Sequence, residues 1–123
     1  MDDNRPLSPH LQVYRLPLNA LLSVSHRLTG VALSFGFVLL VVWLLGIAFL
    51  PTLFDLVQQF LSGWLGQFVL LGLVAMLYFH LCNGIRHLIW DLQLGYENST
   101  VELTSWIVLA ATAVLTFASW LLF

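Results

Sequence analysis

Two histidines, an arginine and an aspartate stand at the end of a long apolar run, in the segment FHLCNGIRHLIWD over residues 79–91. Ionisable groups at membrane depth are costly to place, so they indicate a function. A helix turns by about 100° per residue, which puts His80, Gly84 and His87 within a sector of about 60°. Arg86 points about 120° away from His80. An imidazole with a glycine one turn along could receive the edge of a porphyrin, with His80 as the axial ligand of haem iron.

A structural interpretation of His80 is also open at this point. A single histidine in an apolar helix can be a hydrogen-bonding partner for a neighbouring helix. Glycine is common in membrane helices, so Gly84 alone does not identify a ligand site. The one cysteine, Cys82, excludes an internal disulfide and is interpreted as a packing side chain.

A second polar stripe lies upstream, at positions that share one helix face by the i, i+3, i+4 rule: Ser23, His26, Arg27, Gly30 and Ser34. Hydroxyl, imidazole and guanidinium donors in one stripe suit a neutral carbonyl ligand such as a quinone. Alternatively, Arg27 snorkels to the membrane interface and marks the helix end. The deeper hydroxyls of Thr29 and Ser34 could equally bond to their own helix or pack against another.

These side chains must be positioned by membrane-spanning helices. The 123 residues are 60% hydrophobic and 8% charged, whereas soluble domains are about 25% charged. Three charge-free runs of 27, 30 and 21 residues cover 28–54, 56–85 and 103–123, and a crossing helix needs about 20 apolar residues. Backbone groups in lipid must pair within a helix. We therefore expect an all-α integral membrane bundle, one membrane-anchor domain over 1–123, with transmembrane helices at about 20–50, 62–90 and 104–123.

The segments between the spans carry polar residues, prolines and glycine. Residues 1–18 contain three prolines and are expected to lie against the membrane surface or a partner protein. A proline opens residues 51–61, which are expected to form a short connection. Gly95 is expected to end the second span, and Thr104 or Ser105 to cap the third.

The arginines predict the orientation in the membrane. Arg5, Arg15 and Arg27 precede the first span and Arg86 follows the second, whereas the loop around Asp55 has no basic residue. The positive-inside rule then places the N-terminus in the cytoplasm and the C-terminus in the periplasm. No arginine- and serine-rich transit peptide precedes the first motif, so we expect a multi-pass protein of the bacterial inner (cytoplasmic) membrane. Zinc spacings, phosphate loops and basic patches are absent from the sequence, and nucleic acid is not an expected partner.

Three segments together resemble the cytochrome b (b556) anchor subunit of succinate dehydrogenase, or succinate:quinone oxidoreductase. They are RPLSPHLQVYRLP at 5–17, SVSHRLTGVAL at 23–33 and HLCNGIRHLIWD at 80–91. The combination of SxxHRxTG with HxxxGxRHLxWD one span later is specific, and the resemblance covers nearly the whole chain. It implies a non-flavin membrane-anchor subunit that binds haem b. It also implies a share in the quinone-reduction site, which takes electrons from succinate in the respiratory chain and the tricarboxylic acid cycle.

The resemblance also implies roles for individual residues. His80 falls on the axial ligand position of the haem iron, and Ser23 and Arg27 fall on the quinone site. The neighbourhood of the haem propionates comprises His26, Arg27, Gly84, Arg86 and His87. One haem b would be shared with a second hydrophobic anchor subunit, which supplies the other axial ligand. An iron–sulfur subunit and a flavoprotein subunit would complete the complex in the bilayer, with ubiquinone or menaquinone as substrate.

Two other classes of function compete with this interpretation. A non-redox anchor or assembly protein would use His80 only for helix packing and would bind no haem. A small transport or channel subunit would line a pathway with the polar stripe and would carry ions or solutes independently of quinone. The scarcity of intramembrane charges and the two matched motifs favour the anchor subunit.

Overall fold

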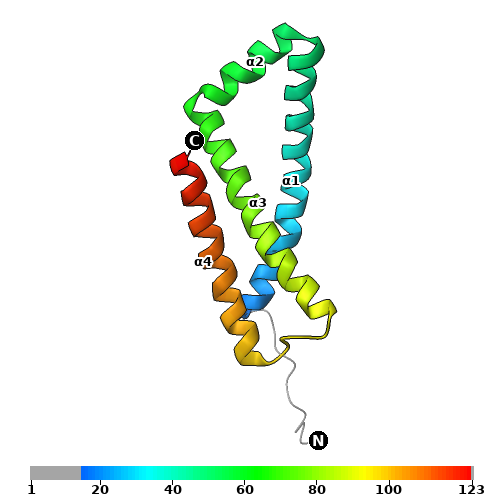
Figure 1. The fold of residues 1–123 in the computed structure, drawn as a ribbon, viewed down its shortest axis with the longest axis vertical. Helices are drawn as coiled ribbons and strands as arrows, with labels where there is room; N and C mark the ends of the chain where they lie inside the picture. Colours follow the sequence, from blue (N-terminus) through cyan, green and yellow to red (C-terminus); the bar gives the residue numbers. More distant parts are fainter. Residues whose placement is uncertain (1–14, 123) are drawn as a thin grey trace, which may run out of the picture.

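The computed structural model describes residues 15–122, which form four α-helices (Figure 1). They are α1 (Leu18–Phe49), α2 (Pro51–Ser62), α3 (Trp64–Asp91) and α4 (Asn98–Leu122). Helices α1, α3 and α4 are long and apolar enough to cross a membrane, which confirms the predicted all-α fold with three spans. The predicted surface segment over 1–18 lies outside the described residues, apart from residues 15–18.

Helix α3 is the central element of the bundle. Helix α1 crosses α3 and diverges from it toward α2, α4 packs along α3, and α2 joins the far ends of α1 and α3 (Figure 1). The start of α1, the end of α3 and the start of α4 lie together at the opposite end from α2. Both motif segments, 23–30 and 80–91, therefore come together at this one end of the bundle.

The connection expected over residues 51–61 is instead a helix, α2. Pro51 ends α1 as expected, but it also begins α2, because the first turn of a helix does not use the N–H group that proline lacks. The backbone of Phe54 packs tightly on Gly46 of α1, where a Cβ atom would lie 3.0 Å from the Phe54 Cα atom. The glycine thus permits the sharp reversal from α1 into α2.

Helix α3 ends before Gly95, the residue expected to end it. Gln93 takes the left-handed conformation at φ 60°. Its N–H group donates to the Trp90 carbonyl at 2.7 Å, and the Leu94 N–H group donates to the Ile89 carbonyl at 3.3 Å. This pair of bonds is a Schellman motif, in which a glutamine replaces the usual glycine.

The predicted caps of the third span are also wrong. Helix α4 begins at Asn98, so Thr104 and Ser105 lie inside it. Their hydroxyl groups donate to helix carbonyl groups, Thr104 to Thr100 at 2.8 Å and Ser105 to Val101 at 2.7 Å. These bonds satisfy the two hydroxyl groups within the helix, although bonds of this kind slightly destabilise a helix.

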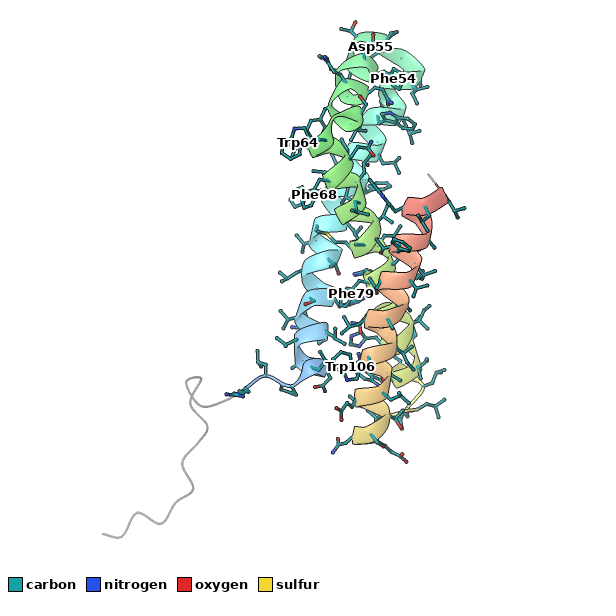
Figure 2. All side chains as sticks on the ribbon, turned by 90° about the vertical axis from the view of Figure 1, so that its left-hand side faces the viewer. Phe54, Asp55, Trp64, Phe68, Phe79 and Trp106 are labelled. Atoms are coloured by element: carbon teal, nitrogen blue, oxygen red, sulfur yellow. The ribbon has the colours of Figure 1, made fainter. Side chains whose placement is uncertain are left out.

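The core of the bundle is small and lies where the three spans meet. Leu22 of α1, Phe79 of α3 and Val108 of α4 are its buried apolar side chains. Most other large apolar side chains are exposed, including Trp64 at 84% and Phe68 at 71%, which project from the outer side of α3 (Figure 2). Such a surface is suited to lipid, where apolar side chains need no protein cover.

Gly66→Ala is expected to destabilise the junction between α2 and α3, because a Cβ atom there would overlap the Phe60 carbonyl oxygen. Overpacking costs about 1–3 kcal/mol. Gly72→Ala is a matched control in the same helix, since nothing lies within 4 Å of its added Cβ atom. Thermal unfolding in detergent, followed by circular dichroism, should give a lower Tm for Gly66→Ala alone. Equal Tm values for the two variants would contradict the close contact.

Candidate functional site

Three imidazole rings gather where α1 and α3 approach each other. The rings of His26 and His80 stack with their centroids 3.9 Å apart and their planes 11° apart. The His87 ring lies 5.2 Å from that of His26, tilted by 44°. The structure therefore brings together three candidate site residues that the sequence analysis named on two separate spans.

The hydrogen bonds of His80 define which ring nitrogen is available. Its Nδ1 atom lies 3.1 Å from the His26 carbonyl oxygen and 3.2 Å from Thr29 Oγ1. A carbonyl oxygen only accepts, so the Nδ1 atom carries the proton, and in the neutral ring Nε2 keeps its lone pair. The Thr29 hydroxyl donates to the same carbonyl at 2.9 Å, which leaves its oxygen to accept from His80. A histidine held in this way offers Nε2 to a metal.

Two glycines let the helices approach closely at this point. A Cβ atom on Gly30 would lie 3.0 Å from His80 Cε1, closer than ordinary contact allows. A Cβ atom on Gly84 would lie 3.5 Å from His26 Nε2, an ordinary contact distance. A side chain at position 30 would thus force the His80 ring to shift, whereas a methyl group at position 84 would meet His26 at an ordinary contact distance.

The donor set decides what kind of metal centre fits. Within residues 15–122 no three His, Cys, Asp or Glu side chains are arranged to hold an ion. A bare ion would therefore lack ligands in this part of the chain, whereas a porphyrin brings its own equatorial nitrogens and needs only axial side chains. His26 Nε2 is buried without a hydrogen-bond partner among the described residues, and it could serve a polar group of such a ligand.

The two residues predicted to bind quinone lie on α1 close to the imidazoles. Ser23 is half-buried and precedes His26 by three residues, and Arg27 is exposed and follows it directly. Ser34, another member of the predicted stripe, donates its hydroxyl to the Gly30 carbonyl at 3.0 Å. This hydroxyl bonds to its own helix, whereas the quinone roles of Ser23 and Arg27 stay predictions.

The sequence analysis missed Asn83, which is fully buried in α3. Its Nδ2 atom donates to the Leu22 carbonyl of α1 at 3.4 Å, and its Oδ1 atom accepts from Arg86 at 3.3 Å. The sequence did contain a signal for this contact, because an amide three residues before an arginine in an apolar helix can bond to it. Asn83 therefore ties α3 to α1 and at the same time satisfies part of a buried guanidinium group.

Arg86 was assigned with His87 to the neighbourhood of the haem propionates, and that role stays a prediction. Only 5% of Arg86 is exposed, and its Cζ atom lies 4.3 Å from the centre of the Trp90 ring. Its Nε atom has no hydrogen-bond partner among the described residues. The contacts that hold the guanidinium in place are therefore the Asn83 amide oxygen and the face of the Trp90 ring.

The known proteins that this chain resembles carry the name succinate dehydrogenase. The family model for the succinate dehydrogenase/fumarate reductase transmembrane subunit matches residues 1–119. The succinate dehydrogenase cytochrome b556 subunit of Paracoccus denitrificans is 41% identical over 120 residues, covering 98% of this chain and 92% of the relative. The protein of the same name from Rickettsia felis is 37% identical over 118 residues, covering 96% and 92%. The succinate dehydrogenase cytochrome b560 subunit of Reclinomonas americana is 35% identical over 130 residues, covering 100% and 89%.

Asn83→Leu is expected to destabilise the protein by about 1–3 kcal/mol, because a buried guanidinium donor loses its acceptor. Adding Arg86→Met removes both partners and should recover part of this loss. Thermal unfolding of the two single variants and the double variant gives the coupling energy, expected at about 0.5–3 kcal/mol. Simple additivity would contradict a direct Asn83–Arg86 bond.

Proposed function

The chain belongs to the succinate dehydrogenase/fumarate reductase transmembrane subunit family, and we propose that it is a non-flavin anchor subunit that binds haem b and helps form the quinone-reduction site. Electrons from succinate reach this site through the iron–sulfur subunit, while succinate oxidation itself takes place on the flavoprotein subunit. The observation that carries the proposal is the hydrogen bonding of His80, which leaves Nε2 as the nitrogen that can ligate iron.

The residues of the candidate site fit a haem b shared between two subunits. His80 would hold the haem iron from this chain, and a histidine of the second anchor subunit would hold it from the other side of the interface. When bound, haem b supplies a one-electron reservoir beside the quinone site. The buried nitrogen atoms His26 Nε2 and Arg86 Nε lack partners among the described residues. Together with His87, they are donors available for anionic propionate groups, which form strong hydrogen bonds with charged donors.

Ser23 and Arg27 form this chain's part of the quinone site. They are four residues apart on α1, so they lie on one face of the helix. Ser23 donates a hydrogen bond to a quinone carbonyl oxygen. Arg27 is exposed and carries a permanent charge, so it stabilises the negative charge that develops on the quinone oxygen during reduction. The quinone is ubiquinone or menaquinone.

The site lies at the cytoplasmic side of the bacterial inner membrane in this proposal. Arg15, Arg27 and Arg86 all fall near one end of the bundle, whereas α2 at the other end contains no basic residue. The positive-inside rule then places the N-terminus and the connection between α3 and α4 in the cytoplasm. The iron–sulfur subunit would dock at this end, next to the quinone.

His80→Ala is expected to abolish the b-type signal in a reduced-minus-oxidised optical spectrum of the purified complex, because one axial ligand is lost. His10→Ala, outside the described residues, controls for the loss of an arbitrary histidine and should keep the signal. A full b-type spectrum in the His80→Ala complex would overturn the ligand assignment.

Ser23→Ala and Arg27→Ala should slow quinone reduction while succinate oxidation by an artificial dye continues. Loss of a neutral hydrogen bond predicts a decrease of about 2–10-fold for Ser23→Ala, and loss of a charged one a decrease of about 10–100-fold for Arg27→Ala. Ser25→Ala, on the same turn but off the stripe, is the matched control. If dye-linked activity fell equally, defective assembly would be the explanation instead.

A further inference from the structure

Residues 26–30 of α1 supply two hydrogen-bond partners, a glycine and a stacked ring that contact the His80 ring. The His26 carbonyl and the Thr29 hydroxyl both lie within hydrogen-bond distance of Nδ1, at 3.1 Å and 3.2 Å. Gly30 lies against the Cε1 edge of the ring, and the His26 ring stacks on its face. The ring is thus constrained by a carbonyl, a hydroxyl, a glycine and a second imidazole within five consecutive residues.

We propose that Thr29 is a positioning residue for the axial ligand, whose hydroxyl oxygen accepts the second hydrogen bond from His80 Nδ1–H and so sets the ring orientation and the electron donation of Nε2. The inference rests on the proposed function, because it assigns a role to Thr29 in the same haem site. It concerns a residue outside the quinone-binding pair and outside the predicted neighbourhood of the propionates.

An imidazole that ligates a metal through one nitrogen usually donates a hydrogen bond from the other nitrogen, and Thr29 can accept that bond. A hydrogen bond accepted from that N–H group fixes the tautomer and raises the basicity of the ligating nitrogen. A more basic ligand stabilises oxidised iron and therefore lowers the reduction potential of the haem. The His26 carbonyl is backbone and persists in any side-chain variant, so Thr29 is the acceptor that the sequence can change.

The plainer interpretation is that the Thr29 hydroxyl only bonds to its own helix, as hydroxyl groups in helices commonly do. Thr104 of α4 shows that behaviour, since its two contacts, at 2.8 Å and 3.2 Å, are carbonyl groups of its own helix. Thr29 differs, because its oxygen also meets a ring nitrogen 51 positions away in the sequence, on another span. The two threonines are both half-buried, which makes Thr104 a matched control.

The test is a redox titration of haem b in the intact complex, with the optical spectrum and the haem content recorded for each variant. Thr29→Val replaces the hydroxyl with a methyl group of similar size and should raise the midpoint potential and speed haem loss in detergent. Thr29→Ser keeps the hydroxyl and should restore the parent values. Thr104→Val should match the parent throughout. If Thr29→Val does not assemble, Thr29→Ala removes the hydroxyl without adding bulk and should show the same shift.

The possible results distinguish failure of the Thr29 role from failure of the proposed haem-binding function. An unchanged potential and an unchanged rate of haem loss in Thr29→Val, with full haem content, would overturn the role of Thr29 and leave His80 as the ligand. Equal shifts in Thr29→Val and Thr104→Val would also overturn it, since both would then reflect general helix stability. A parent complex without a b-type signal would overturn the proposed function and the inference together.

Discussion

The close crossing of α1 and α3 is the constraint on which the rest of the structure depends. Apolar side chains gain little by leaving lipid for protein, so spans associate through tight packing and polar bonds. Here Gly30 admits the His80 ring, and the Asn83 amide bonds to the Leu22 carbonyl one turn away. Some of the contacts that join the two helices therefore also orient the imidazole. Loosening the crossing would disturb the fold and the candidate site together.

The remaining helices support this crossing from outside the site. Helix α4 packs along α3, where the Tyr78 and Ser119 hydroxyl groups lie 2.7 Å apart and Phe79 meets Val108. Helix α2 separates the far ends of α1 and α3, with Trp43 Nε1 donating to Gln58 at 3.1 Å. Contacts with these two helices hold α3 in place where it crosses α1.

The sequence predicted the three spans well, because charge is excluded from lipid whatever the packing. It missed α2, because Pro51 was taken as a break although proline also begins helices. It missed the fully buried Asn83, since hydropathy in a uniformly apolar helix does not distinguish a protein-facing side from a lipid-facing one. It placed His80 and His87 on one helix face and His26 in a polar stripe of another span, and the structure brings the three rings together. The contact between Thr29 and His80 joins two spans, so no periodicity within one span could reveal it.

The polar atoms at the crossing explain why such a chain should function in an assembly. His26 Nε2 and Arg86 Nε are both buried without hydrogen-bond partners among residues 15–122. Each unsatisfied group costs about 1–3 kcal/mol, and no lipid tail can satisfy it. A ligand or subunit that offers acceptors here would recover this free energy on binding, so association stabilises the fold as it completes the site. The residues where the two spans meet therefore form the candidate site and also carry the polar atoms that an assembly would satisfy.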